Sequence, residues 1–162
     1  MTERDHVDRW LDQIREELPE LDLEVEGIVD RVGGISRRLH RLLDDTVAEH
    51  GLTSGEWHLL GKLRRAPSSP GKLSEQFELS SGAMTNRLDR LEEQGLIRRL
   101  PDPADRRGVR VELTPAGQTR WEEAVHAQAA KEQLVAGALS AAEQRELNAL
   151  LRKLMLAFER SE

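Results

Sequence analysis

Apolar residues recur every three or four positions along most of the chain, which is the spacing of an amphipathic α-helix. The first stripe of this kind stops at Pro19 and predicts a helix over about residues 4–17. The second stripe predicts a longer helix over about residues 22–50, which ends before Gly51, a residue suited to the left-handed conformation that closes a helix. Each of these two helices carries one apolar face.

Capping signals divide the next stretch into three shorter helices. Thr53 and Glu56 have the spacing of a capping box and predict the start of a third helix. Pro70 suits the first turn of a short fourth helix, and Ser80 is a candidate N-cap for a fifth helix that ends at Gly95. The fourth and fifth helices are joined by a turn of three or four residues, so together they predict a helix-turn-helix.

Beyond the fifth helix the pattern changes to alternation of apolar and polar residues. This alternation predicts two strands over residues 96–100 and 109–113, joined by a loop over residues 101–108. Two more helices follow, with Thr114 and Ser140 as their N-caps. The expected fold class is mainly α with a small β-hairpin, in the arrangement of a winged helix-turn-helix with helices before and after it.

The composition narrows the class of protein. The chain has 162 residues, the size of one compact domain, and a net charge of −6, which argues against indiscriminate coating of nucleic acid. It has no cysteine, so disulfides, thiolate metal sites and thiol-based redox sensing are excluded. No apolar run is long enough to span a bilayer and Met1–Asp5 lacks a secretory signal, so we expect a cytoplasmic protein.

Positive charge is nevertheless concentrated in one region. Residues 81–110 contain seven arginines and five acidic residues, a balance of +2, which leaves −8 for the remainder. The excess falls on the fifth helix and the hairpin, where contacts to phosphates and grooves would be made. The alternative, a merely solvated charged face, would be the default reading if the helix-turn-helix and the hairpin were absent.

The fifth helix has an apolar and a polar side. Met84, Leu88 and Leu91 share one face. The polar residues on or near the other face are Ser81, Thr85, Asn86, Asp89 and Arg90. We expect DNA contacts from Ser81, Thr85, Asn86 and Arg90, whose hydroxyl, amide and guanidinium groups reach phosphates or base edges. The alternative is a surface helix with ordinary polar residues.

The predicted hairpin loop carries the other candidate DNA contacts. Arg106 and Arg107 lie at the tip of a projecting element, where arginine inserts into a narrow and electronegative minor groove. Asp105 precedes them and would shape the tip by accepting hydrogen bonds or by pairing with an arginine. The alternative for Asp105 is a turn-favouring residue without a partner.

Three segments resemble the multiple-antibiotic-resistance regulators, the MarR family: Arg87–Ile97, Asp102–Gly108 and Val111–Gly117. The resemblance covers about residues 25–160. It implies that the first and last helices build a two-fold dimer, that the fifth helix reads the major groove and that the hairpin is the wing. Such a dimer binds a near-palindromic operator. Arg107 matches the wing-tip arginine of the family, and Asp105 matches the aspartate that supports it.

The resemblance also implies a division of the chain and a function. N-terminal helices occupy residues 1–50, the winged helix-turn-helix residues 51–114 and C-terminal dimerisation helices residues 115–162. The expected partners are double-stranded DNA, a second copy and a small anionic ligand that releases a repressor from DNA. No enzyme, catalytic residue, metal site or cofactor is expected, because nucleophile, phosphate-loop and metal-spacing motifs are missing. The alternatives are a winged-helix module for protein contacts and a regulator without a ligand.

The helix before residue 19 resembles an addition found in the urate-responsive branch of the family. Residues that surround an anionic ligand there match Trp10, His58, Arg87 and Arg99. His58 stands where the branch has an aspartate, which leaves two arginines and an imidazole facing one cavity. The resemblance therefore implies a di- or tricarboxylate rather than urate, as in a related group that responds to aconitate and citrate.

Helical spacing supports one of these residues independently. Arg87 lies three residues from Met84 and four from Leu91, on the inward side of the fifth helix, where an arginine needs an anion. The alternative is an intramolecular salt bridge to an acidic residue of the second helix. For Trp10 and Trp57 the alternative is a place in the core, and for His58 a place in an interface.

Overall fold

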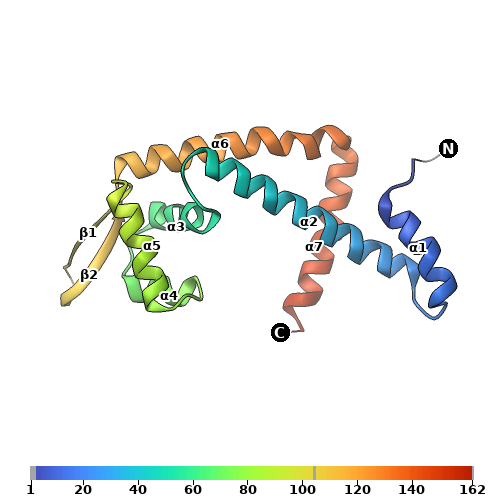
Figure 1. Cartoon of the computed structure of the whole chain (residues 1–162), viewed down its shortest axis with the longest axis horizontal. Coiled ribbons are helices and arrows are strands. Elements are labelled where there is room, and N and C mark those ends of the chain that lie inside the picture. The colour runs from blue at the N-terminus through green and yellow to red at the C-terminus, as the bar shows by residue number, and fades with distance from the viewer. Residues whose placement is uncertain (1–2, 104, 162) are drawn as a thin grey trace. The chain divides into compact units, whose positions relative to one another are not determined.

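The computed structural model describes residues 3–103 and 105–161 and leaves aside the side chains of residues 105–107 and 134–136. Figure 1 shows a mainly helical chain with one hairpin, which confirms the expected fold class. The helices are α1 (His6–Glu17), α2 (Leu23–Glu49), α3 (Ser54–Arg65), α4 (Pro70–Gln76), α5 (Ser81–Glu93), α6 (Pro115–Ala138) and α7 (Ala141–Glu159), and the strands are β1 (Ile97–Asp102) and β2 (Asp105–Leu113). The chain forms two compact units, Met1–Asp45 and Thr46–Glu162.

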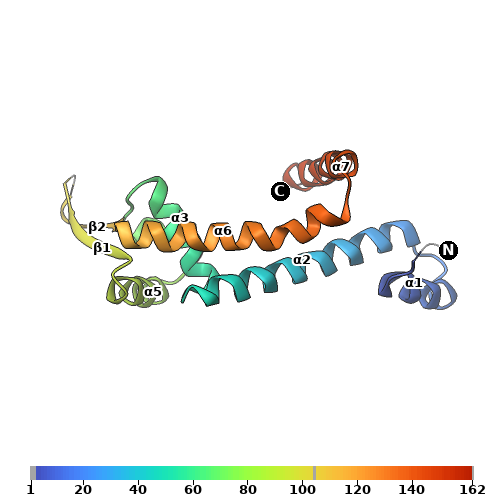
Figure 2. The same ribbon diagram turned by 90° about the horizontal axis from the view of Figure 1, so that it is seen from above.

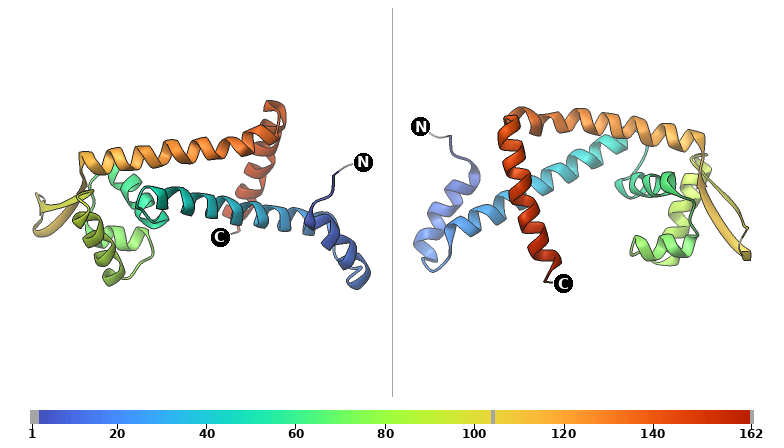
Figure 3. Two further views of the ribbon diagram at one scale, coloured as in Figure 1. Left: turned by 45° about the horizontal axis from the view of Figure 1, so that its top comes forward. Right: turned by 180° about the vertical axis from the view of Figure 1, so that it is seen from behind.

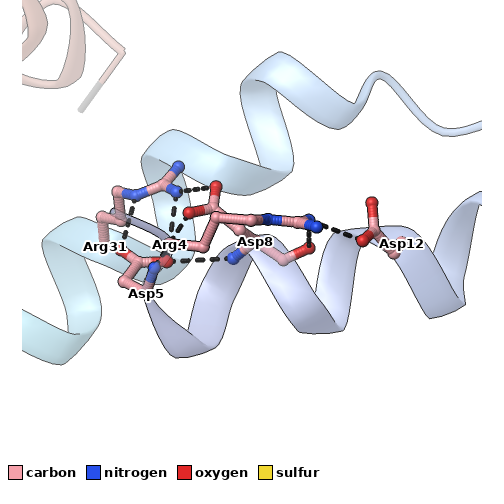
Figure 4. Close-up of polar contacts among 5 residues, drawn as sticks. All are labelled: Arg4, Asp5, Asp8, Asp12 and Arg31. Atoms are coloured by element: carbon pink, nitrogen blue, oxygen red, sulfur yellow. Dashed lines mark hydrogen bonds and ion pairs between the residues drawn. The ribbon is translucent and has the colours of Figure 1, made fainter. Parts of the chain in front are cut away.

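The first unit holds α1 and most of α2. Asp5 is the N-cap of α1 and forms a capping box with Asp8, so the helix starts at His6. Arg31 of α2 reaches back to this cap, with Nη2 2.5 Å from Asp8 Oδ1 and Nε 3.0 Å from Asp5 Oδ2, as Figure 4 shows. Val7 is the buried residue of α1. Ion pairs at the N-terminus of α1 therefore join this helix to α2.

The second unit is built around one apolar core. Seen from behind in Figure 3, α3, α4 and α5 gather beside the hairpin. Each of these elements contributes side chains with almost no exposed surface, and the residues are Leu59, Leu60 and Leu63 (α3), Leu73 (α4), Met84, Leu88 and Leu91 (α5), and Ile97 and Val111 (hairpin). The predicted apolar face of the fifth helix is thus confirmed.

The capping signals of the sequence mark the real helix starts. Thr53 and Glu56 form the predicted capping box of α3, and Ser80 accepts a hydrogen bond from the Ala83 backbone N–H at the start of α5. The turn between α4 and α5 contains Glu78 in the left-handed region, with φ of 52°. This turn completes the helix-turn-helix and changes the direction of the chain between α4 and α5.

The hairpin is longer than its apolar alternation indicated. Its strands extend to Asp102 and from Asp105, so the prediction of a loop over residues 101–108 is wrong. Pro101 still pairs with Val109, and a register shift then brings Asp102 opposite Asp105. Backbone pairing continues to the outer end, where the sequence is polar and shows no alternation of apolar and polar residues.

The last two helices leave the core. α6 runs away from the hairpin as a single rod, and α7 turns off sharply at its far end (Figure 2). Ser140 and Glu143 form the predicted capping box at the start of α7. Among the described residues α7 buries none, and its exposed apolar residues are Leu147, Leu150, Leu151, Leu154, Met155, Leu156 and Phe158.

Candidate functional site

The outward side of α5 carries free polar groups. Ser81, Thr85 and Asn86 are exposed, and their side chains make no hydrogen bond to another described residue. Met84, on the opposite side, is fully buried and holds the helix against the core. Three of the predicted contacts are therefore available to a partner outside the chain.

Arg90, the fourth predicted contact on α5, is joined to α3. Its Nε lies 3.2 Å from Glu56 Oε1, and the Glu56 side chain is only 3% exposed. Glu56 also accepts hydrogen bonds from the backbone and hydroxyl of Thr53. The Arg90 side chain remains 54% exposed, so this ion pair fixes its stem while leaving surface for a further contact.

Arg99, on β1, is joined to α5 by two carboxylates. Its Nη2 lies 2.7 Å from Asp89 Oδ1, and its Nη1 lies 2.5 Å from Glu92 Oε2. Its backbone N–H also donates to Glu92 Oε1, at 2.9 Å. Burial opposes the charged form of Arg99, but these hydrogen bonds outweigh burial and raise its pKa. Arg99 is thus a neutralised cation that ties the wing to α5.

A second group of charges lies on the other face of the hairpin. Arg98 is opposite Glu112 in the register, and its Nη2 is 3.0 Å from Glu112 Oε2. Arg110 also pairs with Glu112, and the two arginines, Arg98 first, lower the pKa of this carboxyl. Sequence reasoning counted both arginines as regional charge but did not single them out. Cross-strand pairing is the signal that would have joined them.

The predicted wing-tip residues are placed by their backbone alone. Asp105, Arg106 and Arg107 belong to β2, at the outer end of the hairpin. Their side chains lie outside what the structure describes. Their roles in DNA binding therefore stay predictions.

Arg87 occupies the inward position that helical spacing predicted. It is half-buried, and a methyl group built on Gly55 of α3 would lie 2.7–2.8 Å from three atoms of its guanidinium. The glycine thus makes room for the cation against α3. Arg87 has no hydrogen bond or ion pair to another described residue of its own unit, Thr46–Glu162, and the alternative of a salt bridge to an acidic residue of α2 stays a prediction.

His58 is one helical turn from Gly55, on the same helix. Its Nδ1 lies 2.7 Å from the Ser54 carbonyl oxygen, and because a carbonyl only accepts, Nδ1 donates this bond. The exposed Nε2 is then left for another partner. Among the described residues, no hydrogen bond or ion pair joins any two of His58, Arg87 and Arg99, which lie on α3, α5 and β1.

An aromatic stack adjoins His58. Trp57 contacts the His58 ring edge-on, with centroids 4.9 Å apart, and stacks on Trp121 of α6 at 6.2 Å. The Arg64 guanidinium carbon lies over the Trp121 ring, 4.6 Å from the ring centroid. Gly61 permits this packing, because a Cβ there would lie 2.8 Å from Trp121 Nε1. Trp57 and Trp121 would therefore report on events near His58.

Trp10 belongs to the first unit, where it is half-buried on α1. A cleft of about 360 Å³ opens in this unit between α1 and α2, but Trp10 is not among its lining residues. The cleft is bordered by charges that are already paired with each other, such as Arg4 with Asp12. The assignment of Trp10 to a ligand site stays a prediction.

Other chemistries find little support in the described residues. No group of three or more His, Asp or Glu side chains there is arranged to hold a metal ion. No helix in that part of the chain is long and apolar enough to cross a bilayer.

Known proteins share this arrangement. The sequence pattern of the MarR family matches residues 52–109, from just before α3 into β2. The HTH-type transcriptional regulator PecS of Dickeya dadantii (strain 3937) is 32% identical over 151 residues, which are 91% of this chain and 89% of that protein. The chain belongs to the MarR family. The expectation of a transcriptional regulator rather than an enzyme is confirmed by these relatives.

Solved structures of MarR-family type confirm the winged-helix fold. YusO of Bacillus subtilis has a TM-score of 0.75 at 22% identity and covers 85% of this chain and 99% of its own. A mutant of MarR from E. coli complexed with operator DNA has a TM-score of 0.61 at 28% identity, over 87% of this chain and 96% of its own. The helix-turn-helix and hairpin are therefore those of a winged-helix family.

Proposed function

We propose that this MarR-family protein binds operator DNA as a dimer and that a small carboxylate ligand releases it. The exposed polar face of α5 is the single observation that carries the DNA-binding part, because Ser81, Thr85 and Asn86 have no partner in the described part of the chain. The second helix of a helix-turn-helix enters the major groove. The complex of E. coli MarR with operator DNA supports this assignment.

The wing supplies the second set of contacts in this proposal. Arg106 and Arg107 enter the minor groove, and Asp105 holds the tip in shape. Arg90, whose side chain is more than half exposed beside Glu56, contacts a phosphate. The resulting binding depends on salt, because cations of the protein displace counterions from the phosphates.

A second copy of the chain is the natural partner of α7. A continuous apolar face of this size rarely stays in water on a monomer. Two-fold pairing would place two α5 helices in major grooves about 34 Å apart, which requires a near-palindromic operator. Repression follows if this operator overlaps a promoter.

The ligand part of the proposal rests on Arg87. A half-buried guanidinium without an anion is costly unless a ligand supplies one. A di- or tricarboxylate would pair with Arg87 and accept from or donate to His58 Nε2. Arg99 would join only by exchanging Asp89 or Glu92 for a carboxylate of the ligand. The ligand would then pull on α5 and on the wing together.

DNA binding is tested with the duplex upstream of the protein's own gene. We expect tight binding that weakens steeply as salt is raised. The substitution Asn86→Ala should lower the affinity about tenfold or more, because it removes a groove contact. Gln13→Ala, which removes an exposed amide from α1, is the matched control and should bind like the wild type. Failure of the wild type to bind DNA would favour a winged-helix module for protein contacts.

Ligand release is tested by adding citrate, trans-aconitate, urate or salicylate to the DNA complex. Tricarboxylates should release DNA by several-fold to about a hundredfold and change tryptophan fluorescence, whereas urate should not. Arg87→Ala should retain operator binding and lose the response. Arg65→Ala removes an exposed arginine that has no partner among the described residues, and this variant should respond normally. Unchanged release in the Arg87 variant would contradict the proposed site.

A further inference from the structure

The acidic residues of α5 are unexpected on a helix that meets DNA. Asp89 and Glu92 are 48% and 38% exposed, so neither is needed to fill the core. A carboxylate close to phosphates opposes binding through like-charge repulsion. These two residues therefore need a role that offsets this repulsion.

The contacts of Arg99 indicate that role. Glu92 holds this residue at two points, since one carboxylate oxygen accepts from the backbone N–H and the other pairs with Nη1. Asp89, almost one helical turn earlier, pairs with Nη2 at 2.7 Å. The guanidinium is thereby gripped from two positions on α5, which restricts its direction as well as its distance.

The position of Arg99 along β1 lets these contacts hold the strand beyond the core. Ile97, two residues earlier on the same face of the strand, is buried in the core and fixes the base of the hairpin. Arg99 extends the attachment of the strand to α5 by a further two residues toward the outer end. An arginine is long enough to reach α5 from where the hairpin leaves the core.

A second ion pair fixes α5 on its other side. Arg90, the residue after Asp89, pairs with the buried Glu56 of α3. Successive residues of α5 thus connect the helix to α3 and to the wing. The helix is held between the two by charge as well as by its buried leucines.

We propose that Asp89, Glu92 and Arg99 form a brace that fixes the wing relative to α5, which makes Arg99 a positioning residue for DNA binding. This inference rests on the proposed function. The brace sets the separation between groove contacts of α5 and those of Arg106 and Arg107, so that one rigid surface meets both grooves. Its loss leaves α5 in place and lets the wing move.

Removing a negative charge from α5 distinguishes the brace from simple electrostatics, because the two predict opposite changes in DNA affinity. Glu92→Gln removes a negative charge near DNA, so electrostatics alone predicts tighter binding. The brace predicts binding about tenfold weaker, because wing contacts are lost. Glu93→Gln is the matched control, since Glu93 is the next residue, is exposed and has no partner among the described residues. It should bind as tightly as the wild type or more tightly.

Footprinting separates the wing from α5. In Glu92→Gln the minor-groove protection from hydroxyl radicals should disappear, while protection of guanine N7 in the major groove persists. Tight binding of Glu92→Gln with full protection in both grooves would overturn the brace.

A measurement without DNA keeps the brace separate from the proposed function. In the free protein, the Arg99 amide should exchange with solvent faster in Glu92→Gln than in Glu93→Gln, because its acceptor is weakened. Equal exchange in the two variants would refute the brace even if DNA binds. Faster exchange in a protein that binds no DNA would refute the positioning role together with the proposed function.

Discussion

The winged-helix part of the chain and helix α7 differ in the burial of their apolar residues. Leu60 and Leu88 of the winged helix have no exposed surface, whereas Met155 and Phe158 of α7 are 58% and 69% exposed. The first region contains its own core and is complete as one chain. The second has an apolar face that the described residues of its own unit, Thr46–Glu162, leave exposed, so its stability depends on further apolar surface.

Helix α2 resembles α7 in this respect. Most of its exposed apolar residues follow a repeat of three and four, and these are Val25, Ile28, Val32, Ile35 and Leu39; Val29, which is also exposed, lies beside this repeat. A seam with this spacing is typical of helices that pack along one another. The comparison therefore separates two kinds of region. The winged helix buries its apolar residues against one another, whereas α2 and α7 need additional apolar surface to cover theirs.

The largest effect is expected from a charge on the apolar face of α7. Leu154→Glu should weaken dimer formation about a hundredfold or more, because two leucines per dimer lose their burial and two carboxylates are introduced. Sedimentation at several protein concentrations would measure this. Ala149→Glu, which adds the same charge outside the apolar stripe, is the control. A wild-type monomer, or a Leu154 variant that pairs normally, would contradict the assignment of this face.

The next effect is expected in the core of the winged helix. Leu60→Ala should lower the free energy of unfolding by about 2–5 kcal/mol, since it leaves a cavity in a fully buried site. Urea unfolding at fixed protein concentration would measure this. Leu150→Ala, at a site 55% exposed, should leave winged-helix stability unchanged once dimerisation is taken into account. Equal losses in both variants would erase the contrast between the two regions.

A glycine pair tests how tightly the winged helix joins α6. A Cβ on Gly117 would overlap the Leu96 carbonyl oxygen, so the backbone must shift to admit it. Gly117→Ala should therefore cost about 1–3 kcal/mol of unfolding free energy. Gly71 also lies in the first turn of a helix that begins with proline, but its Cβ would meet nothing within 4 Å. Gly71→Ala should be neutral or stabilising, and thermal melts of the two variants would measure both effects. A loss equal to that of Gly117→Ala would contradict the packing argument.

Sequence reasoning succeeded where the signal is local. The capping box of Thr53 with Glu56 and the buried stripe of α5 both follow from spacing within one turn or two, and the structure confirms them. The inward position of Arg87 followed from the same stripe. These features depend on helical geometry alone, which a single sequence determines well.

The missed features depend on packing between elements. No local pattern indicates that Arg99 pairs with Asp89 and Glu92, because this requires knowing how the hairpin lies against α5. The outer half of the hairpin was missed for a related reason. Its strands pair through the backbone, and its sequence lacks the alternation of apolar and polar residues that marks a half-buried strand.

The smallest effect is expected where α1 meets α2, through exposed charges rather than a core. The pKa of Asp5 is lowered to about 2 from 3.8, first by the hydrogen bond from the Asp8 backbone N–H and then by Arg31. Because ionised Asp5 favours the folded cap, its contribution is present above about pH 4 and is lost as the pH falls toward 2.

Acid should therefore loosen the start of α1 before it unfolds the leucine-rich core, and the Val7 amide resonance would follow this transition. Asp5→Asn is the informative variant, because asparagine caps a helix as well as aspartate but cannot titrate or form an ion pair with Arg31. In that variant α1 should persist at neutral pH and the acid transition at Val7 should vanish. If the transition remained, the titrating group would lie elsewhere, and the contrast between a charge-held helix and an apolar core would lose its basis.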